Sequence, residues 1–332
     1  MDRGVLSINR PVEPKKSASN HREPPPIVLL LDGHSLAYRA FYALPPLTTS
    51  AGKPTGAILG FANMVLHLIE EYHPSSLVVT FDAPGRTFRH DLEKEYKAQR
   101  KPIPDPLQEQ FPGIKDLLSL MGLRWVEQPG YEGDDLIGTL LKKLPLDQLA
   151  GIVSSDLDLL QLLDEKTFLL QPIKGVTILK TIDLTVLEKE LGLTPPQVVD
   201  FIALSGDPSD NIPGVPGIGE KTATRLLRQY ASWQGIRDHL ADLPPSLQKM
   251  VMEHGKQVDL NRQLVVIHQD APIEDIFPPW NWEGIHWEQL LSKLDEIEMK
   301  KLKNRLLKKR EKSLVVPDDF ELPLFSTLHR KQ

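Results

Sequence analysis

The chain contains no cysteine among its 332 residues. Disulfides, thiolate-bound metals and a cysteine nucleophile are therefore excluded, and any metal ion must be held by oxygen or histidine ligands. Long apolar runs are also missing, since the run Ile27–Leu31 is far shorter than the roughly 20 apolar residues that span a bilayer. Residues 1–26 lack the apolar segment of a signal peptide. We therefore expect a cytoplasmic protein without a membrane partner.

A positive excess is missing as well, because the formal net charge is −6. This balance argues against a nonspecific nucleic-acid coat protein, which needs Lys and Arg for phosphate binding. The basic residues are instead concentrated in two stretches: residues 86–101 hold six against three acidic ones, and residues 300–312 hold eight against one. The remaining composition is that of a globular protein, and the length allows one large domain or two smaller ones.

Strand-like and helical patterns alternate in the first half of the chain. Three strands are expected at Ile27–Leu31, Leu77–Phe81 and Gly151–Ser154, and helices lie between them at Gly56–Tyr72 and Leu136–Leu144. This order predicts an α/β domain over 27–197, with a central, mostly parallel sheet flanked by helices. A helical module is expected over 198–312, and flexible tails over 1–26 and 313–332.

Acidic residues stand at the ends of the expected strands, where ligands of such sheets bind. Singly, each can be a helix N-cap or a dipole partner. Together they repel one another and require compensating cations. Oxygen ligands favour two Mg²⁺ ions, for which Mn²⁺ can substitute, and two such ions hydrolyse phosphodiesters. The nine candidate metal ligands are Asp32, Asp82, Glu132, Asp134, Asp135, Asp156, Asp158, Asp207 and Asp210.

Six motifs, in this order, resemble those of the 5′ nuclease domain of bacterial DNA polymerase I, here as a stand-alone protein related to flap endonucleases. The motifs are LLLDGHSLAYRAFYA (29–43), VVTFDAPGRTFRH (78–90), YKAQRKP (96–102), GYEGDD (130–135), IVSSDLDLLQLL (152–163) and GDPSDNIPGVPGIGEKTATRLL (206–227). The resemblance implies a PIN-like, resolvase-like fold and a monomer that removes 5′ flaps, 5′ nucleotides and primer RNA in replication and repair. Implied partners are duplex DNA with a 5′ flap or 5′ end, RNA–DNA primer junctions and a DNA polymerase.

The same resemblance implies roles for individual acids. Around one metal it places Asp32, Asp82, Glu132 and Asp134. Around the second it places Asp134, Asp156, Asp158 and Asp207. Asp135 and Asp210 resemble outer members of the set. Gly133 replaces a common Ala and Leu157 a common Lys, but neither change removes a ligand.

The basic stretch between Asp82 and Glu132 resembles the family's helical arch, expected here over about 84–128. Lys97 and Arg100, three residues apart, are expected on one helix face, where they can hold the scissile phosphate and stabilise transition-state charge. A solvated face with salt bridges is the alternative. We expect Arg86 and Arg89 to contact phosphates. Tyr38 is expected either to stack on an unpaired base or to belong to the core.

The segment around 206–228 resembles a helix-hairpin-helix motif within a helix-three-turn-helix. Glycines let the backbone approach a phosphate, and helix-start amides can donate to it. A nucleotide-binding loop is rejected because Glu220 separates Gly219 from Lys221. The resemblance implies nonspecific duplex binding, with a K⁺ ion as a possible cofactor. The candidate DNA-binding residues of this motif are Gly217, Gly219, Lys221 and Thr222.

The last candidate site is a short peptide in the C-terminal tail. Glu321, Leu322, Leu324 and Phe325 resemble a sliding-clamp-binding peptide, with Glu in place of the usual Gln; an unbound tail is the alternative. Two other readings of the whole chain remain open. One is a non-catalytic module that binds branched DNA, and the other is a related metal-dependent ribonuclease.

Overall fold

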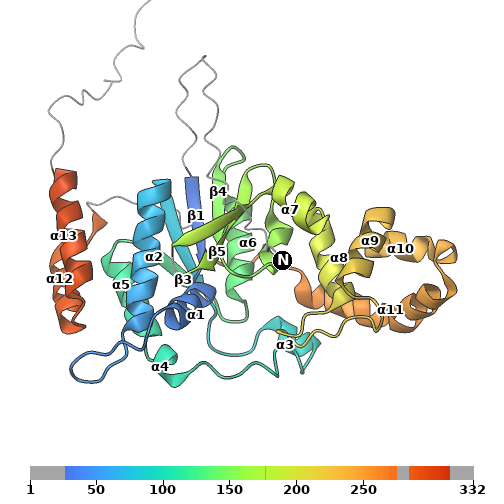
Figure 1. Ribbon diagram of the computed structural model, residues 1–332, viewed down its shortest axis with the longest axis horizontal. Helices are drawn as coiled ribbons and strands as arrows, with labels where there is room; N and C mark the ends of the chain where they lie inside the picture. Colours follow the sequence, from blue (N-terminus) through green and yellow to red (C-terminus); the bar gives the residue numbers. More distant parts are fainter. Residues whose placement is uncertain (1–26, 176, 275–283, 315–332) are drawn as a thin grey trace, which may run out of the picture.

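The computed structural model describes residues 27–175, 177–274 and 284–314 (Figure 1). The strands are β1 Ile27–Asp32, β2 Ser76–Phe81, β3 Arg124–Glu127, β4 Leu149–Val153, β5 Thr167–Lys174 and β6 Ile178–Ile182. The helices of the first domain are α1 Gly33–Ala43, α2 Gly56–Tyr72, α3 Phe88–Leu92, α4 Asp105–Gln108, α5 Phe111–Leu120, α6 Gly133–Lys143 and α7 Leu184–Leu191, with the 3₁₀ helix η1 Asp158–Leu162. The later helices are α8 Pro195–Ser205, α9 Glu220–Tyr230, α10 Trp233–Asp238, α11 Pro245–Val265, α12 Trp287–Glu296 and α13 Lys300–Leu314, with the 3₁₀ helix η2 Leu240–Asp242.

The N-terminal tail and the clamp-like peptide at 321–325 lie outside the described residues. Among the described helices, none combines the length and apolar character needed to cross a bilayer.

The sheet has the strand order β3-β2-β1-β4-β5-β6. Every neighbouring pair is parallel except β5 and β6, which form an antiparallel hairpin. The predicted mostly parallel α/β sheet is therefore confirmed. The three strands expected from the sequence are the central ones, β2, β1 and β4, which have the most continuous apolar runs.

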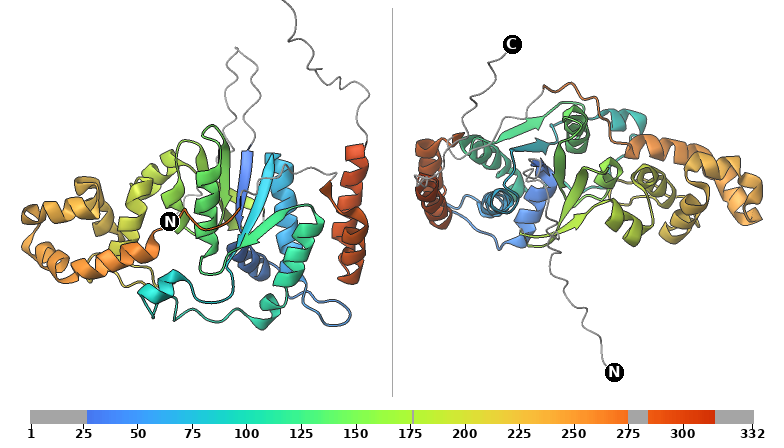
Figure 2. Two further views of the ribbon diagram at one scale, coloured as in Figure 1. Left: turned by 180° about the vertical axis from the view of Figure 1, so that it is seen from behind. Right: turned by 90° about the horizontal axis from the view of Figure 1, so that it is seen from above.

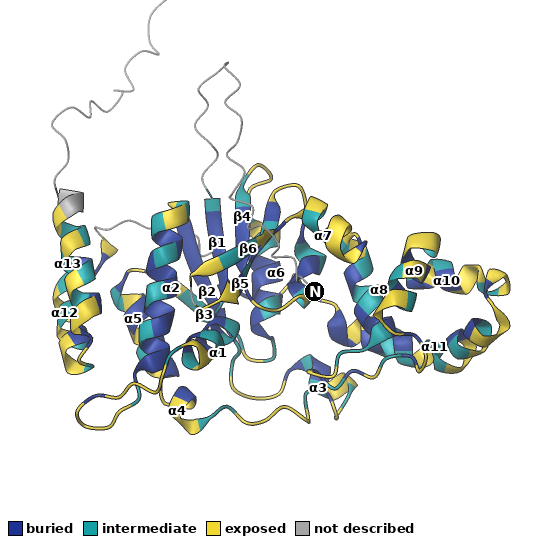
Figure 3. Cartoon of the chain, in the orientation of Figure 1, coloured by how far each residue is buried: buried dark blue, intermediate teal, exposed yellow. Residues whose placement is uncertain are grey.

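The sheet separates two apolar cores, because successive side chains of a strand point to opposite faces. Leu29 and Leu31 of β1 pack with α1, α2 and α5, whereas Val28 and Leu30 pack with α6, η1 and α7. A third core joins α8 to α11 in the helical module. This module projects from one end of the α/β domain, with its buried residues turned inward (Figures 1 and 3).

The last two helices do not belong to the helical module, contrary to the boundary of 198–312 expected for it. Their apolar residues join the core of the α/β domain, on the face formed by α2 and α5. These helices stand at the opposite end of the long axis from α9 and α10 (Figures 1 and 2). The residues that anchor them are Ile285, Leu290, Leu294, Met299, Leu302 and Leu306.

Candidate active site

A cleft of about 1100 Å³ lies at the carboxyl ends of β1, β2 and β4. Parallel strands end at the same edge, so loops from distant parts of the chain meet there. Seven of the nine candidate carboxylates line the cleft, while Asp135 and Asp210 are buried beside it. The seven are Asp32, Asp82, Glu132, Asp134, Asp156, Asp158 and Asp207.

Asp32 is held by the junction between β1 and α1. One carboxylate oxygen caps α1 by accepting the Ser35 amide at 3.0 Å, and the other accepts the Ser154 hydroxyl at 2.7 Å. Gly33 permits this tight turn, because a Cβ there would lie 2.4 Å from the Phe81 ring and 2.6 Å from the Thr80 carbonyl. The two hydrogen bonds therefore fix the direction of the Asp32 side chain, at a point where the backbone lies close against β2.

The start of α6 supplies a second group of acids. Glu132 and Asp135 form a reciprocal capping box, in which the Asp135 carboxylate accepts the Glu132 amide at 3.1 Å. Asp82 accepts the Gly133 amide at 2.7 Å, and its own amide donates to Nδ1 of His34 at 3.0 Å. The end of β2 and the start of α1 are thereby linked to the start of α6, whose N-cap is Glu132.

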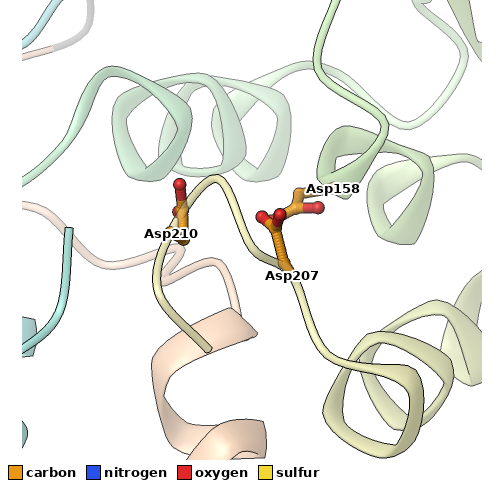
Figure 4. Close-up of side chains that lie close together, drawn as sticks. All are labelled: Asp158, Asp207 and Asp210. Carbon is orange, nitrogen blue, oxygen red and sulfur yellow. The ribbon is translucent and has the colours of Figure 1, made fainter. Parts of the chain in front are cut away.

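The third group comes from the loop after α8 and from η1. Asp158, Asp207 and Asp210 place one carboxylate oxygen each within 4.8 Å of one another (Figure 4). Ser209 donates its amide to Asp207 at 2.8 Å and its hydroxyl to the other Asp207 oxygen at 3.0 Å. The helical module therefore contributes acids to a site whose other walls belong to the α/β domain.

The clustered acids are electrostatically strained without a cation. Removal from water in the cleft raises the pKa of Asp32 to about 7, with Asp82 and Asp156 adding repulsion. The pKa values of Asp134 and Asp158 are also well above normal, first through desolvation and then through neighbouring carboxylates. Carboxylate oxygens grouped in this way suit a hard divalent cation, which would reverse these shifts.

Two cations partly offset the acids. Lys97 Nζ donates to Glu132 at 2.7 Å and lies 3.7 Å from Asp210, while Arg100 donates to Asp210. Burial favours the neutral amine, yet Glu132 and Asp210 raise the pKa of Lys97 above its usual value. Lys97 therefore remains charged at neutral pH.

The helix expected around Lys97 and Arg100 is not formed. The chain follows consecutive turns here, and Lys97 has a left-handed φ of 56°. Its amide donates to the Asp210 carbonyl at 2.9 Å, which ties the segment to the loop after α8. Over the expected arch, 84–128, only the short helices α3 and α4 precede α5. The segment around Lys97 is thus held by its bond to the loop after α8 and does not form a continuous helix.

Arg89, expected to contact phosphate, is instead buried, with 1% of its surface exposed. It donates to both oxygens of Asp135 at 2.7 and 2.8 Å, and to the carbonyls of Leu264 and Val266 at 2.7 and 2.9 Å. Asp135 is fully buried and also accepts the His268 amide at 2.8 Å. The pair therefore joins α3, the start of α6 and the end of α11, and neither side chain reaches the cleft.

The other candidate DNA-binding residues of the α/β domain are accessible. Arg86 is exposed and lies 3.4 Å from Asp91. Tyr38 lines the cleft, with its ring 6.5 Å from that of Tyr42 and nearly parallel to it.

Three further residues of the site were not anticipated from the sequence. Ser154 holds Asp32, and the Tyr96 hydroxyl lies 3.1 and 3.2 Å from carboxylate oxygens of Glu132 and Asp210. Both stand inside quoted motifs, which was the available signal. Lys115 lines the cleft over the Trp125 ring, and nothing in its sequence context marks it.

The glycine-rich turn precedes α9, whose N-cap is Gly219. Gly217 has a φ of 83°, and a Cβ there would lie 2.7 Å from the Met250 methyl group. Lys221 is exposed and Thr222 half-buried in the first turn of α9. The start of α9 therefore lies at the surface of the module, with Glu220 and Lys221 exposed.

Two family descriptions cover most of the chain. Residues 27–192 match the 5′-3′ exonuclease N-terminal resolvase-like domain, and residues 193–286 match the 5′-3′ exonuclease C-terminal SAM fold. The chain therefore belongs to the 5′-3′ exonuclease family, and its fold is that of this nuclease family. The boundary expected at 198 falls within α8, which the second match includes in the C-terminal domain.

Some of the matched relatives are covered almost completely by this chain, whereas others are much longer. A 5′-3′ exonuclease of Aquifex aeolicus is 39% identical over 274 residues, which cover 82% of this chain and 92% of the relative. Thermostable DNA polymerase I of Thermus thermophilus is 44% identical over 253 residues, which cover 76% of this chain and 30% of the polymerase. The chain thus spans less than a third of that polymerase.

Solved structures share the fold at low identity. T5 5′-exonuclease with bound divalent metal ions (zinc) has a TM-score of 0.60 and 20% identity, covering 85% of this chain and 98% of the other. The catalytic core of Rad2 in complex with DNA substrate has a TM-score of 0.59 and 13% identity, covering 86% and 92%. The fold is therefore that of both proteins.

Proposed function

We propose that the protein hydrolyses DNA phosphodiesters at 5′ ends and 5′ flaps, using Mg²⁺ held by the carboxylates of the cleft. The observation that carries this proposal is the gathering of seven carboxylates from separate parts of the chain, beside Lys97 and Arg100. A non-catalytic DNA-binding module would have no use for so many unneutralised acids in one cleft.

Two ions would be held by different groups of acids. One ion would be held by Asp32, Asp82 and the acids at the start of α6. The second ion would be held by Asp156, Asp158 and Asp207, and Asp134 would lie between the two ions. Such ions activate water and stabilise the leaving oxygen. T5 5′-exonuclease with divalent ions bound supports the same use of the fold. Asp135 and Asp210 support the site from beside the cleft.

Lys97 and Arg100 would hold the scissile phosphate. Both now pair with Glu132 or Asp210, and incoming divalent cations would compete for those carboxylates. The Lys97 ammonium and the Arg100 guanidinium would then be available to bind a phosphate oxygen, and both side chains would stay within the cleft. The bond from the Lys97 amide to the Asp210 carbonyl would hold this segment beside the acids.

The helical module would position the duplex through the α9 start, with Lys221 and Thr222 beside backbone phosphates and K⁺ as a bridging ion. Tyr38 would stack on an unpaired base in the cleft, and Arg86 would contact a phosphate at its rim. These residues would contact the phosphate backbone and the 5′ end of the DNA rather than base edges, so we expect little sequence preference.

We further propose that substrates include primer RNA joined to DNA and repair intermediates, in cooperation with a DNA polymerase. The polymerase I relatives support this role, since the same nuclease region occurs in their chains. The peptide at 321–325 would bind a sliding clamp. Deletion of residues 318–332 should then abolish clamp binding in calorimetry without changing cleavage of a free flap.

The test of the catalytic site uses Asp158→Asn, which keeps the shape of the side chain and removes its charge. Flap cleavage with Mg²⁺ should be abolished, while binding to the same flap duplex in Ca²⁺ should remain close to wild type. Asp183→Asn, at the N-cap of α7 outside the cleft, is the matched control and should cleave normally. Full cleavage by Asp158→Asn would overturn the proposed mechanism.

A further inference from the structure

The side chain of Gln161, on the 3₁₀ helix η1, makes three hydrogen bonds that the proposed mechanism does not use. Its nitrogen donates to the Asp158 carbonyl at 3.0 Å and to the Val265 carbonyl at 3.1 Å. Its oxygen accepts the Ile267 amide at 2.9 Å. Gln161 is half-buried and is not one of the residues that line the cleft. Both donor hydrogens of the side chain are therefore used by the protein backbone.

The backbone that Gln161 binds is the segment where α11 returns to the α/β domain. α11 begins in the apolar core of the helical module, whereas its last two residues belong to the core on the α6 side of the sheet. The chain then follows α6, where the His268 amide donates to Asp135 at 2.8 Å and the Ala271 amide to the Thr139 hydroxyl at 3.0 Å. Gln161 joins the same segment to η1.

The position of η1 matters because this short helix carries a candidate metal ligand. Asp158 is its first residue, and a carboxylate oxygen of Asp158 lies within 4.8 Å of oxygens of Asp207 and Asp210 (Figure 4). The Asp158 amide donates to Asp156 at 2.9 Å, and the Asp158 carbonyl accepts Gln161. Hydrogen bonds within a 3₁₀ helix have poor geometry, so contacts from outside are needed to hold one in place. A shift of η1 would move Asp158 relative to Asp207.

Apolar packing of η1 is the alternative source of this order. Leu159 and Leu160 are buried in the core that also contains Ile267. Hydrophobic burial is non-directional, so it holds η1 on the core without selecting one orientation. Hydrogen bonds depend strongly on angle and distance. The three bonds of Gln161 can therefore fix the Asp158 backbone in a way that packing alone cannot.

We propose that Gln161 is a positioning residue for the second metal ion, which holds Asp158 against the end of α11 and touches neither the ion nor the substrate. The inference rests on the proposed function, in which Asp156, Asp158 and Asp207 bind that ion. Replacing a residue that orients metal ligands typically lowers metal affinity or activity about 10–100-fold. Because Asp207 comes from the loop after α8, the ion needs acids of both domains in register, and Gln161 ties η1 to the helix that crosses between them.

The test replaces Gln161 by Met, which has a similar length and cannot form the three hydrogen bonds. Mn²⁺ binding to the full chain is measured by calorimetry without DNA, and the Mg²⁺ dependence of flap cleavage is measured in parallel. Gln161→Met should weaken the binding of one Mn²⁺ ion about 10-fold or more and raise the Mg²⁺ concentration for half-maximal cleavage by a similar factor. Gln161→Asn, whose shorter side chain cannot reach all three groups, should shift both quantities in the same direction.

Gln197→Met is the matched control, because Gln197 is also half-buried and makes the same set of bonds away from the cleft. Its nitrogen donates to the carbonyls of Leu227 and Ala231 at 2.9 and 3.0 Å, and its oxygen accepts the Thr194 amide at 3.0 Å. The two Met variants should lose similar stability in urea. Gln197→Met should nevertheless keep the wild-type affinity for both Mn²⁺ ions.

Unchanged Mn²⁺ affinity in Gln161→Met, or equal weakening in the two Met variants, would overturn the proposal. If Gln161→Met did not fold, Gln161→Asn would decide by the same comparison with Gln197→Met. Wild-type protein that binds Mn²⁺ but cleaves no flap in Mg²⁺ would refute the proposed function, while the Mn²⁺ titrations would still decide the role of Gln161. Wild-type protein that binds no Mn²⁺ would overturn both.

Discussion

Replacement of Arg89 by Met tests how the acidic start of α6 is held. The substitution removes four hydrogen bonds, two of them to the fully buried carboxylate of Asp135. Removing one partner of a buried pair costs about 3–5 kcal/mol, because the other charge stays buried without compensation. Typical domains have a total stability of about 5–15 kcal/mol, so the loss should be large. We expect Arg89→Met to lower the free energy of unfolding by about 3–5 kcal/mol.

Urea unfolding, followed by circular dichroism and tryptophan fluorescence, measures this loss. Arg86→Met is the control, because Arg86 is exposed and its pair with Asp91 should contribute no more than about 1 kcal/mol. Arg89→Lys should remain strongly destabilised, since a lysine cannot reproduce the guanidinium fork that reaches Asp135 and two carbonyls together. A loss below about 1 kcal/mol in Arg89→Met would refute this role of the pair.

Two further predictions concern the substrate. Lys97→Met should slow single-turnover flap cleavage about 10²-fold, because a charged donor to the transition state is lost; Lys94→Met, at an exposed position nearby, should keep the wild-type rate. Equal rates for the two variants would exclude the assigned role of Lys97. Lys221→Ala should weaken duplex binding and reduce the salt slope by about 1, with an unchanged rate at saturating DNA. A slower rate at saturation would show that Lys221 acts in the chemical step.

The sequence predicted the central fold because its signals there are local. The apolar runs of β1, β2 and β4 follow from the strand period. The acids that follow these strands come together because parallel strands end at the same edge of the sheet. The edge strands β3 and β6, and β5 beside β6, were not predicted. They are shorter or more exposed, and pairing with neighbours rather than an apolar run defines them.

Other features depend on contacts between distant segments. Arg89 looked like one more basic residue of the 86–101 stretch, and only its packing against Asp135 and the end of α11 shows that it is buried. The spacing of Lys97 and Arg100 suggested a helix, but a bond from the Lys97 amide to the Asp210 carbonyl holds a turn instead. The helical pattern of α12 and α13 was visible, whereas the core they join was not, because helical periodicity does not specify a partner.

The most direct test of the central claim is cleavage of a 5′-labelled flap duplex by the wild-type protein, in Mg²⁺ and in EDTA. The carboxylate cleft predicts release of the labelled flap in Mg²⁺ and no release in EDTA, since the acids alone only repel the substrate phosphate. Cleavage that persists at the same rate in EDTA, or no cleavage in either condition, would contradict the assignment of this cleft as a metal-dependent nuclease centre.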